Sequence, residues 1–395
     1  MSDKQFIVIG LSDSRKQWFS PEVKEIIAGG YLFSGGKRHH EIVKDILPSG
    51  FAWIDIVVPL DNVWAEYAPH DRIVVFASGD PLFYGFAATI RRRFPDCRMK
   101  VFPVFNSLQM LAHRKLLPYA EMMNVSVTGR PWKELDAALI SQFPLIGVLT
   151  DRKKGPAEIA GRLLEYGYTN YMITIGENLG NESEELVRSL SLEEAVGKTF
   201  SHPNCVILTR ICPRQRYFGL PETEFSHLAG RKNMITKMPV RLMSISMLDL
   251  YGKQTLWDIG FCTGSVSIEA KLQFPSLDVV AFERREESRG LLIDNCRKFG
   301  APGITGVIGD FMECDLSHYP SPDAVFIGGH GGRLDEMTRR IYKVLNKGGV
   351  IVFNSVSPES CRVFRESVEA CGGVIEAEHR LIVDNHNPIT IMKAK

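Results

Sequence analysis

The sequence predicts an α/β protein with two domains. Apolar stretches of strand length alternate with segments of helical periodicity in the first half, which is the pattern of an α/β fold. A polar stretch over 212–227, punctuated by two prolines and a glycine, interrupts this alternation, which then begins again. At 395 residues the chain has room for two or three domains of about 150 residues each. The expected parts are a first domain over 1–212, a linker over 213–226 and a second domain over 227–395.

The first domain is expected to alternate strands with helices. The segment 156–167, PAEIAGRLLEYG, has apolar residues at helical spacing and is predicted to be a helix. The predicted strands are 5–11, 30–35, 71–79, 99–104, 144–150, 171–177 and 204–210.

The second domain is expected to form one sheet of seven strands. Its last two apolar segments have no helical segment between them, so we predict that they pair antiparallel at an edge of the sheet. The predicted strands are 255–260, 277–283, 304–309, 323–329, 349–356, 373–385 and 388–394.

The composition excludes several classes of protein. The formal net charge is +1, from 47 basic and 46 acidic side chains, whereas a nucleic-acid-binding protein carries a basic excess. The opening residues lack the features of a signal peptide, and no apolar run reaches the ~20 residues that span a bilayer. None of the eight cysteines lies in a Cys-x-x-Cys or Cys–His pattern. We therefore expect a cytoplasmic protein with reduced thiols, no metal site and no nucleic-acid or membrane partner.

A glycine loop in the stretch DIGFCTGS opens the second domain after a buried strand. Glycines allow the backbone to approach a ligand closely, and the helix that follows offers free N–H groups. The dinucleotide-binding pattern G-x-G-x-x-G does not fit, because its second and third positions are Cys262 and Ser265. The loop instead resembles the D-x-G-x-G-x-G loop of S-adenosylmethionine-dependent methyltransferases, with Cys262 at the middle glycine. This resemblance implies cofactor contacts from Asp258, Gly260, Phe261, Cys262, Thr263 and Gly264.

Two later carboxylates and a glycine turn support the same cofactor. Glu283 ends the next predicted strand, where a carboxylate accepts hydrogen bonds from both ribose hydroxyls. Asp310 follows the third strand with Phe311, at a position that faces the adenine. The segment VLNKGGVIVF resembles the turn that leads into the fifth strand of such enzymes.

Five motifs follow one another in the first half: GYLFSGGKRHHEIV, VVFASGDPLFYGF, VFPVFNSLQMLAHRKLLPYAEMMNVSVTGRPW, VLTDRKKGPAEIAGRLLEYG and ITIGENLGNESEEL. Together they resemble the tetrapyrrole methylase family, in the cobalamin-pathway branch that methylates a precorrin at C-5. The family folds into two α/β lobes with the cofactor between them. Where it has a G-I-G-P-G-like loop, this sequence has Leu11, Ser12 and Asp13 after Gly10. The resemblance implies cofactor contacts from Gly10, Gly79, Asp80, Pro81, Tyr84, Ser107, Thr128 and Gly129.

The second half contains MITKMPVRLMSISML, then the glycine loop, then VFIGGHGGRLDEM. These motifs resemble the branch of the same pathway that methylates C-15 and removes a carboxyl group, on a Rossmann-like methyltransferase fold. This resemblance implies cofactor contacts from Thr236, Gly328 and Gly329. His330 stands where the family has serine, and it is the candidate catalytic residue, either as a cation that holds an acetate or as a neutral proton acceptor.

Together the two resemblances imply a bifunctional methyltransferase with one S-adenosylmethionine per domain. Its substrate would be an acidic tetrapyrrole, for which arginine and lysine are natural partners. The expected substrate contacts are Lys37, Arg38, Arg130, Lys237, Arg241 and Arg333. A homo-oligomer is also expected. Two alternatives stay open: a methyltransferase for RNA or a small metabolite with one active domain, and a first half that only holds the substrate.

Overall fold

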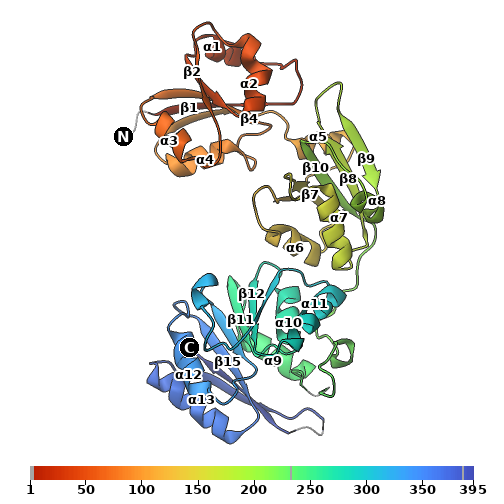
Figure 1. The fold of residues 1–395 in the computed structure, drawn as a ribbon, viewed down its shortest axis with the longest axis vertical. Helices are drawn as coiled ribbons and strands as arrows, with labels where there is room; N and C mark the ends of the chain where they lie inside the picture. Colours follow the sequence, from red (N-terminus) through yellow and green to blue (C-terminus); the bar gives the residue numbers. More distant parts are fainter. Residues whose placement is uncertain (1–3, 232–233, 385–386) are drawn as a thin grey trace. The chain divides into compact units, whose positions relative to one another are not determined.

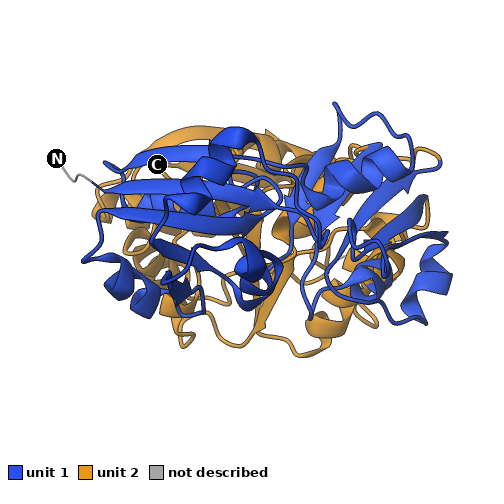
Figure 2. Cartoon of the chain, turned by 90° about the horizontal axis from the view of Figure 1, so that it is seen from above, with its two compact units in different colours: residues 1–130, 144–161, 171–211 blue, residues 131–143, 162–170, 212–395 orange. Residues whose placement is uncertain are grey.

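The computed structural model describes residues 4–231, 234–384 and 387–395, which form three β-sheets with helices against them (Figure 1). The chain divides into two compact units (Figure 2). Unit 1 contains Met1–Arg130, Pro144–Gly161 and Tyr171–Ile211, and unit 2 contains Pro131–Phe143, Arg162–Asn170 and Cys212–Lys395. In the described part of the chain, no helix combines the length and the apolar character needed to cross a bilayer.

The first sheet of unit 1 is parallel throughout and has the strand order β3-β2-β4-β1-β5. Ile73 and Val75 of β4 pack into a core on one face, and Val74 and Phe76 pack into a second core on the other. A strand buried on both faces explains the continuous apolar run in the sequence. The elements are β1 (Gln5–Leu11), α1 (Pro21–Ala28), β2 (Leu32–Gly35), α2 (Lys37–Val43), η1 (Lys44–Ile46), β3 (Ala52–Asp55), α3 (Asp61–Tyr67), β4 (Arg72–Ser78), α4 (Phe86–Arg93) and β5 (Arg98–Phe102).

The second sheet of unit 1 is mostly antiparallel, with the strand order β6-β7-β10-β8-β9. Leu108 and Leu111 of α5 pack against Cys205 and Ile207 of the central strand β10. The capping box of Asn106 and Gln109 starts α5 next to this sheet. The elements are α5 (Ser107–Arg114), β6 (Met123–Ser126), β7 (Leu145–Leu149), α7 (Pro156–Glu165, shared between the two units), β8 (Tyr171–Glu177), β9 (Leu186–Leu190), α8 (Leu192–Val196) and β10 (Asn204–Arg210).

The sheet of unit 2 has seven strands in the order β13-β12-β11-β14-β15-β17-β16. The first five are parallel, and β17 pairs antiparallel with both β15 and β16. The chain leaves the central strand β11 toward β12 on one side and reaches β14 on the other, which makes a switch point where open α/β sheets bind ligands. The strands are β11 (Thr255–Ile259), β12 (Asp278–Glu283), β13 (Ile304–Ile308), β14 (Ala324–Ile327), β15 (Val350–Ser355), β16 (Ile375–Leu381) and β17 (Ile389–Ala394).

The helices assigned to unit 2 include one from the first half of the sequence. They are α6 (Lys133–Ile140), α9 (Met238–Met247), α10 (Ser265–Gln273), α11 (Glu287–Phe299), α12 (Leu334–Tyr342) and α13 (Pro358–Ala370), with the short turns η2 (Glu222–Glu224) and η3 (Leu316–His318). The core has two parts: Leu256 and Phe326 belong to one cluster of apolar side chains, and Trp257 and Ile327 to the other.

The predicted α/β class is confirmed, as are the helix over 156–167 and the antiparallel pair of late strands. The sequence did not predict β3, β6 and β9, which all lie at sheet edges. The predicted strand 373–385 is shorter in the structure, as β16, and its last residue, Asn385, lies outside the described residues.

The segment predicted as a linker is bound within unit 2. The backbone N–H groups of Gly219 and Leu220 each donate to the Glu269 carboxylate at 2.9 Å. Residues 131–143 and 162–170 also belong to this unit. The compact units are defined by contacts within the structure and do not determine where a domain begins in the sequence. The predicted domain boundaries at 212 and 227 therefore stay a prediction.

Candidate functional site

Unit 2 contains a cavity of about 390 Å³ at the carboxyl ends of β11, β12 and β14. This is the edge at which parallel sheets bind ligands. The glycine loop after β11 and the segment after β14 form neighbouring walls. The predicted residues that line the cavity are Thr236, Asp258, Gly260, Phe261, Cys262, Thr263, Glu283, Asp310, Phe311, Gly328, Gly329, His330 and Arg333.

The glycine loop depends on its first glycine. Gly260 has a φ of +80°, and a Cβ atom there would lie 2.7 Å from the backbone nitrogen of Gly329. Cys262 also lies in the left-handed region, at φ +52°, which a side chain adopts only at a cost in free energy. Its thiol donates a hydrogen bond to the Met234 carbonyl at 3.1 Å, and burial raises its pKa to about 11, so it stays protonated. Gly264 does not line the cavity but starts α10 with a positive φ.

The Glu283 carboxylate holds this loop. One oxygen accepts a hydrogen bond from the Cys262 backbone N–H at 3.1 Å. The other accepts from the backbone N–H groups of Arg284 and Arg285 at 2.9 and 3.2 Å, and from the Arg285 side chain at 3.0 Å. The carboxylate is therefore fixed in the cavity wall before any ligand arrives.

Unit 1 contains a second cavity, of about 460 Å³, lined by residues from both of its sheets. Five predicted residues line it: Arg38, Gly79, Tyr84, Ser107 and Thr128. The other predicted residues of this half lie outside its lining: Gly10, Lys37, Asp80, Pro81, Gly129 and Arg130.

Several of these outer residues shape the cavity indirectly. A Cβ atom on Gly10 would lie 2.1 Å from the Gly79 carbonyl, so glycine lets the end of β1 approach the turn after β4. Asp80 closes that turn by accepting a hydrogen bond from the Leu82 N–H at 2.9 Å. The Arg130 guanidinium lies 4.9 Å from the ring centre of Tyr84, as a cation–π contact.

Four polar side chains that line the unit 1 cavity had no predicted role. Ser12 and Asp13 come from the altered loop after β1, whereas His39 lies in α2 and Ser78 ends β4. Asp13 forms an ion pair with Arg38 at 3.0 Å. Burial raises the pKa of Asp13, and the charge of Arg38 acts in the opposite direction. The signal in the sequence was the departure from the G-I-G-P-G pattern itself.

Comparison with known proteins gives two family matches along the chain. The sequence model of "Tetrapyrrole (Corrin/Porphyrin) Methylases" matches residues 7–195, and that of "Precorrin methyltransferase domain" matches residues 228–394. The chain is 29% identical over 371 residues to a Precorrin-6Y C(5,15)-methyltransferase [decarboxylating] from Sinorhizobium sp, covering 93% of this chain and 88% of the relative. It is 38% identical over 133 residues to the Cobalt-precorrin-6B C(15)-methyltransferase (decarboxylating) of Salmonella typhimurium, covering 34% of this chain and 68% of the relative.

The chain belongs to the precorrin methyltransferase family. A third relative, the Cobalt-precorrin-7 C(5)-methyltransferase of Salmonella typhimurium, is 28% identical over 180 residues, which is 45% of this chain and 87% of that protein. This precorrin methyltransferase is therefore an enzyme, and its family implies the use of S-adenosylmethionine.

The unit 2 cavity of this precorrin methyltransferase fits such a cofactor. Asp258 is buried, and one carboxylate oxygen accepts hydrogen bonds from the Ser267 N–H and hydroxyl at 3.1 and 2.6 Å. Its other oxygen has no partner among the described residues. Burial raises the pKa of Asp258 to about 6. A buried acceptor without a partner is costly, so Asp258 suits a ligand that brings a hydrogen-bond donor or a positive charge.

His330 follows β14 and lines the same cavity. Its Nδ1 accepts a hydrogen bond from the Gly332 backbone N–H at 3.2 Å, and its ring meets Phe353 edge-on at 5.9 Å. Burial lowers its pKa. Both observations favour a neutral ring with its proton on Nε2, which makes His330 a hydrogen-bond donor toward the cavity.

The predicted substrate contacts of unit 2 differ in their surroundings. Arg333 lines the cavity, with ion pairs to Glu336 at 2.6 Å and Asp310 at 3.7 Å. Lys237 precedes α9 and does not line the cavity.

Arg241 is fully buried, and its guanidinium pairs with Glu269 at 3.3 Å and donates to the Thr236 carbonyl at 3.0 Å. Because the guanidinium is buried and already paired with Glu269, we no longer expect Arg241 to contact the substrate.

Two basic residues that line the unit 2 cavity, Arg284 and Arg285, were missed in the sequence, and Arg285 pairs with Glu283 at 3.0 Å. Arg284 is exposed and lines the cavity beside Gly331, where a Cβ atom would lie 3.2 Å from its Nη1. The sequence feature that could have identified Arg284 is its position directly after Glu283. In the described ranges, no group of three or more His, Cys, Asp or Glu side chains is placed to hold a metal ion.

Proposed function

We propose that this chain is a bifunctional methyltransferase of cobalamin biosynthesis that acts on a precorrin-6-type tetrapyrrole. It would methylate C-5 and C-15 and decarboxylate a ring acetate to give a precorrin-8-type product. The name of its Sinorhizobium relative gives methylation at C-5 and C-15 and a decarboxylation for that protein. The observation that carries this proposal is the presence of two different methyltransferase families in one chain, over 7–195 and 228–394. Each match includes residues that line a separate cavity.

The two cavities divide the reaction between them in this proposal. The tetrapyrrole methylase half, with its two lobes, would methylate C-5, and the Rossmann-like half would methylate C-15 and release carbon dioxide. Each half would bind one S-adenosylmethionine. The cytoplasmic location and the homo-oligomer inferred from the sequence remain parts of the proposal that await measurement.

The chemistry asks the protein mainly to position its reactants. S-adenosylmethionine supplies an activated methyl group, and a bridge carbon of a reduced tetrapyrrole is an electron-rich nucleophile. Alignment of the reacting atoms contributes several kcal/mol without a strong base. In unit 2, Asp258 and Glu283 would hold the cofactor, while Arg284 and Arg333 would bind substrate carboxylates. The conjugated ring itself accepts the electrons released by decarboxylation.

His330 would act as a donor in this scheme. Its Nε2–H would hydrogen-bond to the ring acetate or to the tetrapyrrole near C-15. Collection of a proton on Nδ1 would break the hydrogen bond from Gly332, so the donor role requires the smaller rearrangement.

Mass spectrometry of a precorrin-6-type substrate incubated with the full chain and S-adenosylmethionine tests the proposal. We expect a gain of two methyl groups and a loss of one carbon dioxide, together with two equivalents of cofactor bound per chain. The alternative of a single active site is favoured by the altered loop after β1 in unit 1, where Asp13 pairs with Arg38. One equivalent of cofactor and one methyl group would support that alternative.

A further inference from the structure

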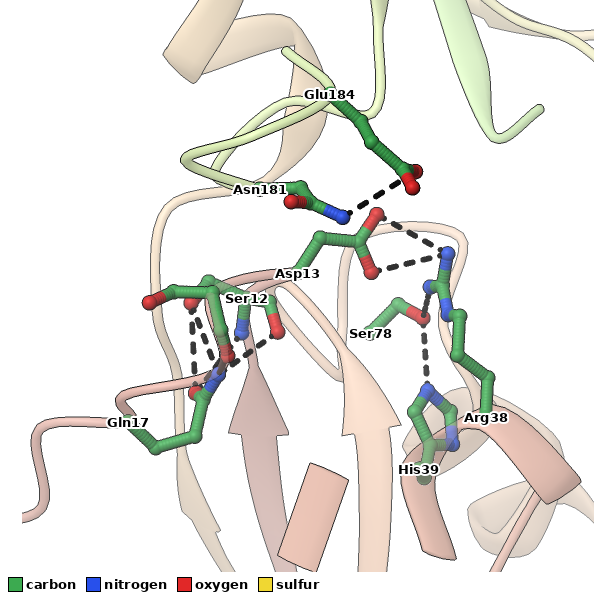
Figure 3. A network of polar contacts seen from close by, with 9 residues as sticks. Ser12, Asp13, Gln17, Arg38, His39, Ser78, Asn181 and Glu184 are labelled. Carbon is green, nitrogen blue, oxygen red and sulfur yellow. Dashed lines mark hydrogen bonds and ion pairs between the residues drawn. The ribbon is translucent and has the colours of Figure 1, made fainter. Parts of the chain in front are cut away.

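Arg38 and His39 both contact the hydroxyl of Ser78 in the unit 1 cavity, and Asp13 joins this cluster through Arg38 (Figure 3). Ser78 ends β4, Arg38 and His39 lie in the first turn of α2, and Asp13 follows β1. Arg38 Nη2 lies 3.0 Å and His39 Nε2 2.9 Å from Ser78 Oγ. Arg38 Nη1 contacts both carboxylate oxygens of Asp13, at 3.0 and 3.1 Å. The cluster therefore links three separate segments of the unit.

The hydrogen bonds fix which atoms carry protons. His39 Nδ1 accepts from the backbone N–H of Gly36 at 3.2 Å, so it bears no hydrogen and the ring is neutral with its proton on Nε2. Burial, reinforced by the charge of Arg38, lowers the pKa of His39 to about 4, which agrees with this state. The Nε2–H therefore donates to Ser78 Oγ. Arginine is always a donor, so Ser78 receives two hydrogen bonds.

A serine hydroxyl accepts two hydrogen bonds and donates one. With both acceptor positions of Ser78 filled by Arg38 and His39, its O–H is directed away from them. None of the contacts described for Ser78 uses that hydrogen. Arg38 carries five N–H donors, which is more than its contacts with Asp13 and Ser78 require. Two oriented donors thus lie side by side in a cavity wall.

We propose that the Ser78 hydroxyl and the Arg38 guanidinium bind one carboxylate of a ligand in the unit 1 cavity, and that His39 is the positioning residue that orients Ser78. This inference rests on the proposed function, because both reaction partners named there carry carboxylates: the acetates and propionates of the tetrapyrrole, and the amino-acid end of the cofactor. A carboxylate has two oxygens, so it can accept a charge-assisted hydrogen bond from the guanidinium and a second hydrogen bond from the hydroxyl.

Asp13 limits the strength of this site. Its carboxylate neutralises Arg38 and competes with an incoming carboxylate for the same guanidinium. Asp13→Asn keeps an oxygen for Arg38 but removes the negative charge, so the ligand should bind about fivefold more tightly, within the range of a partly exposed ion pair. A gain in affinity cannot result from misfolding, which makes this variant a strict test.

The first experiment compares Ser78→Ala with wild type in the full chain, with the exposed Ser49→Ala as the matched control. Loss of one hydrogen bond to a charged ligand should weaken binding roughly tenfold. If the carboxylate belongs to the cofactor, one of two S-adenosylmethionine sites weakens in calorimetry. If it belongs to the tetrapyrrole, the KM of the tetrapyrrole for C-5 methylation rises while cofactor binding is unchanged. Wild-type values for Ser78→Ala in both measurements would overturn the proposal.

Two substitutions of His39 test its positioning role. A glutamine amide can place an N–H donor where Nε2 lies, whereas asparagine can only replace the Nδ1 acceptor. We expect His39→Gln to retain the wild-type ligand affinity within about twofold. His39→Asn should lose as much affinity as Ser78→Ala, because in both variants one hydrogen bond to the ligand is lost. Equal behaviour of the two variants would contradict the positioning role. A wild-type chain that binds one cofactor, or adds no methyl at C-5, would instead refute the proposed function.

Discussion

At the scale of single residues, Glu283 has two tasks: it holds the glycine loop and, in the proposed function, it binds the cofactor ribose. Glu283→Ala should weaken cofactor binding in unit 2 by roughly 1–3 kcal/mol, because a charged hydrogen-bond partner is removed. Calorimetric titration of the full chain measures this, and the exposed Glu286→Ala serves as control. Unchanged affinity in a folded Glu283→Ala variant would refute the ribose assignment.

His330 should affect turnover more than cofactor affinity. Removal of its Nε2–H in His330→Ala leaves a substrate acceptor without a donor, and one such hydrogen bond is worth about 1 kcal/mol, or roughly a fivefold loss of rate. His330→Ser, which restores a hydroxyl donor, should recover much of that rate. Single-turnover methylation and carbon dioxide release measure both variants. If His330→Ala methylates the substrate and releases carbon dioxide at wild-type rates, His330 has no role in the reaction.

Asp258 predicts a pH dependence of stability. Its folded-state pKa of about 6 lies above its ordinary value of 3.8, so the folded protein retains a proton that the unfolded chain has lost. The stability from this proton is fully present below about pH 4 and is lost as the pH rises through 6. Between pH 5 and 8 the wild type should lose on the order of 1 kcal/mol relative to Asp258→Asn. Urea unfolding at both pH values tests this, with the exposed Asp294→Asn as control; parallel profiles for wild type and Asp258→Asn would contradict it.

The site residues that the sequence placed best are those whose position depends on backbone geometry; their roles stay a prediction. Gly260 and Glu283 occupy positions that a strand, a tight loop and the next strand define, so their spacing places them in the cavity. Arg241 was predicted to contact the substrate, but the structure buries it against the Glu269 carboxylate. A sequence motif does not show whether an arginine is buried or exposed. Ser78 was missed because its role depends on His39, which is distant in sequence.

At the scale of elements, the strands that the sequence missed share one property. β3, β6 and β9 are edge strands of four or five residues, and β9 has no buried residue. Edge strands are covered on fewer sides than central ones, so they lack the continuous apolar run that identified β1 and β11. Their pairing partners in the sheet, rather than their own composition, make them strands.

An ionic cluster holds α6 in unit 2. Both oxygens of the buried Asp136 accept hydrogen bonds from Arg162, at 2.6 and 2.7 Å. The nearby Lys271 is also buried, and burial lowers its pKa to about 8 although Asp136 acts in the opposite direction. Asp136→Ala would leave the Arg162 guanidinium without its carboxylate and Lys271 with one fewer opposing charge, and it should destabilise unit 2 by about 3–5 kcal/mol.

The same helix provides the control for this prediction. Lys133 pairs with Asp278 at 2.7 Å, but both side chains are partly exposed, at 33% and 43%. Lys133→Ala should therefore cost at most about 1 kcal/mol. Urea unfolding of the full chain compares the two variants, and an equal loss in both would show that burial of the Asp136 cluster contributes nothing.

At the scale of the whole molecule, the proposed function predicts that each unit can be inactivated separately. Arg38→Ala should impair the C-5 methylation of unit 1, and Glu283→Ala should impair the C-15 methylation and decarboxylation of unit 2. The full chain is the right material, because α6 and residues 162–170 belong to unit 2 and a fragment that starts near Phe225 would lack them. Each variant alone should fail to complete the product.

A mixture of the two variants should restore the complete product, because each supplies the site that the other lacks and the intermediate can diffuse between chains. This expectation does not depend on which carbon is methylated first. The variant that is blocked at the first step makes no product alone, but its second site is intact. That site can accept the intermediate that the other variant makes. Mass spectrometry of the mixture, beside each variant at the same total concentration, measures the effect. A mixture no more active than the sum of its parts would mean that both methylations depend on the same intact site, and the division between the units would be wrong.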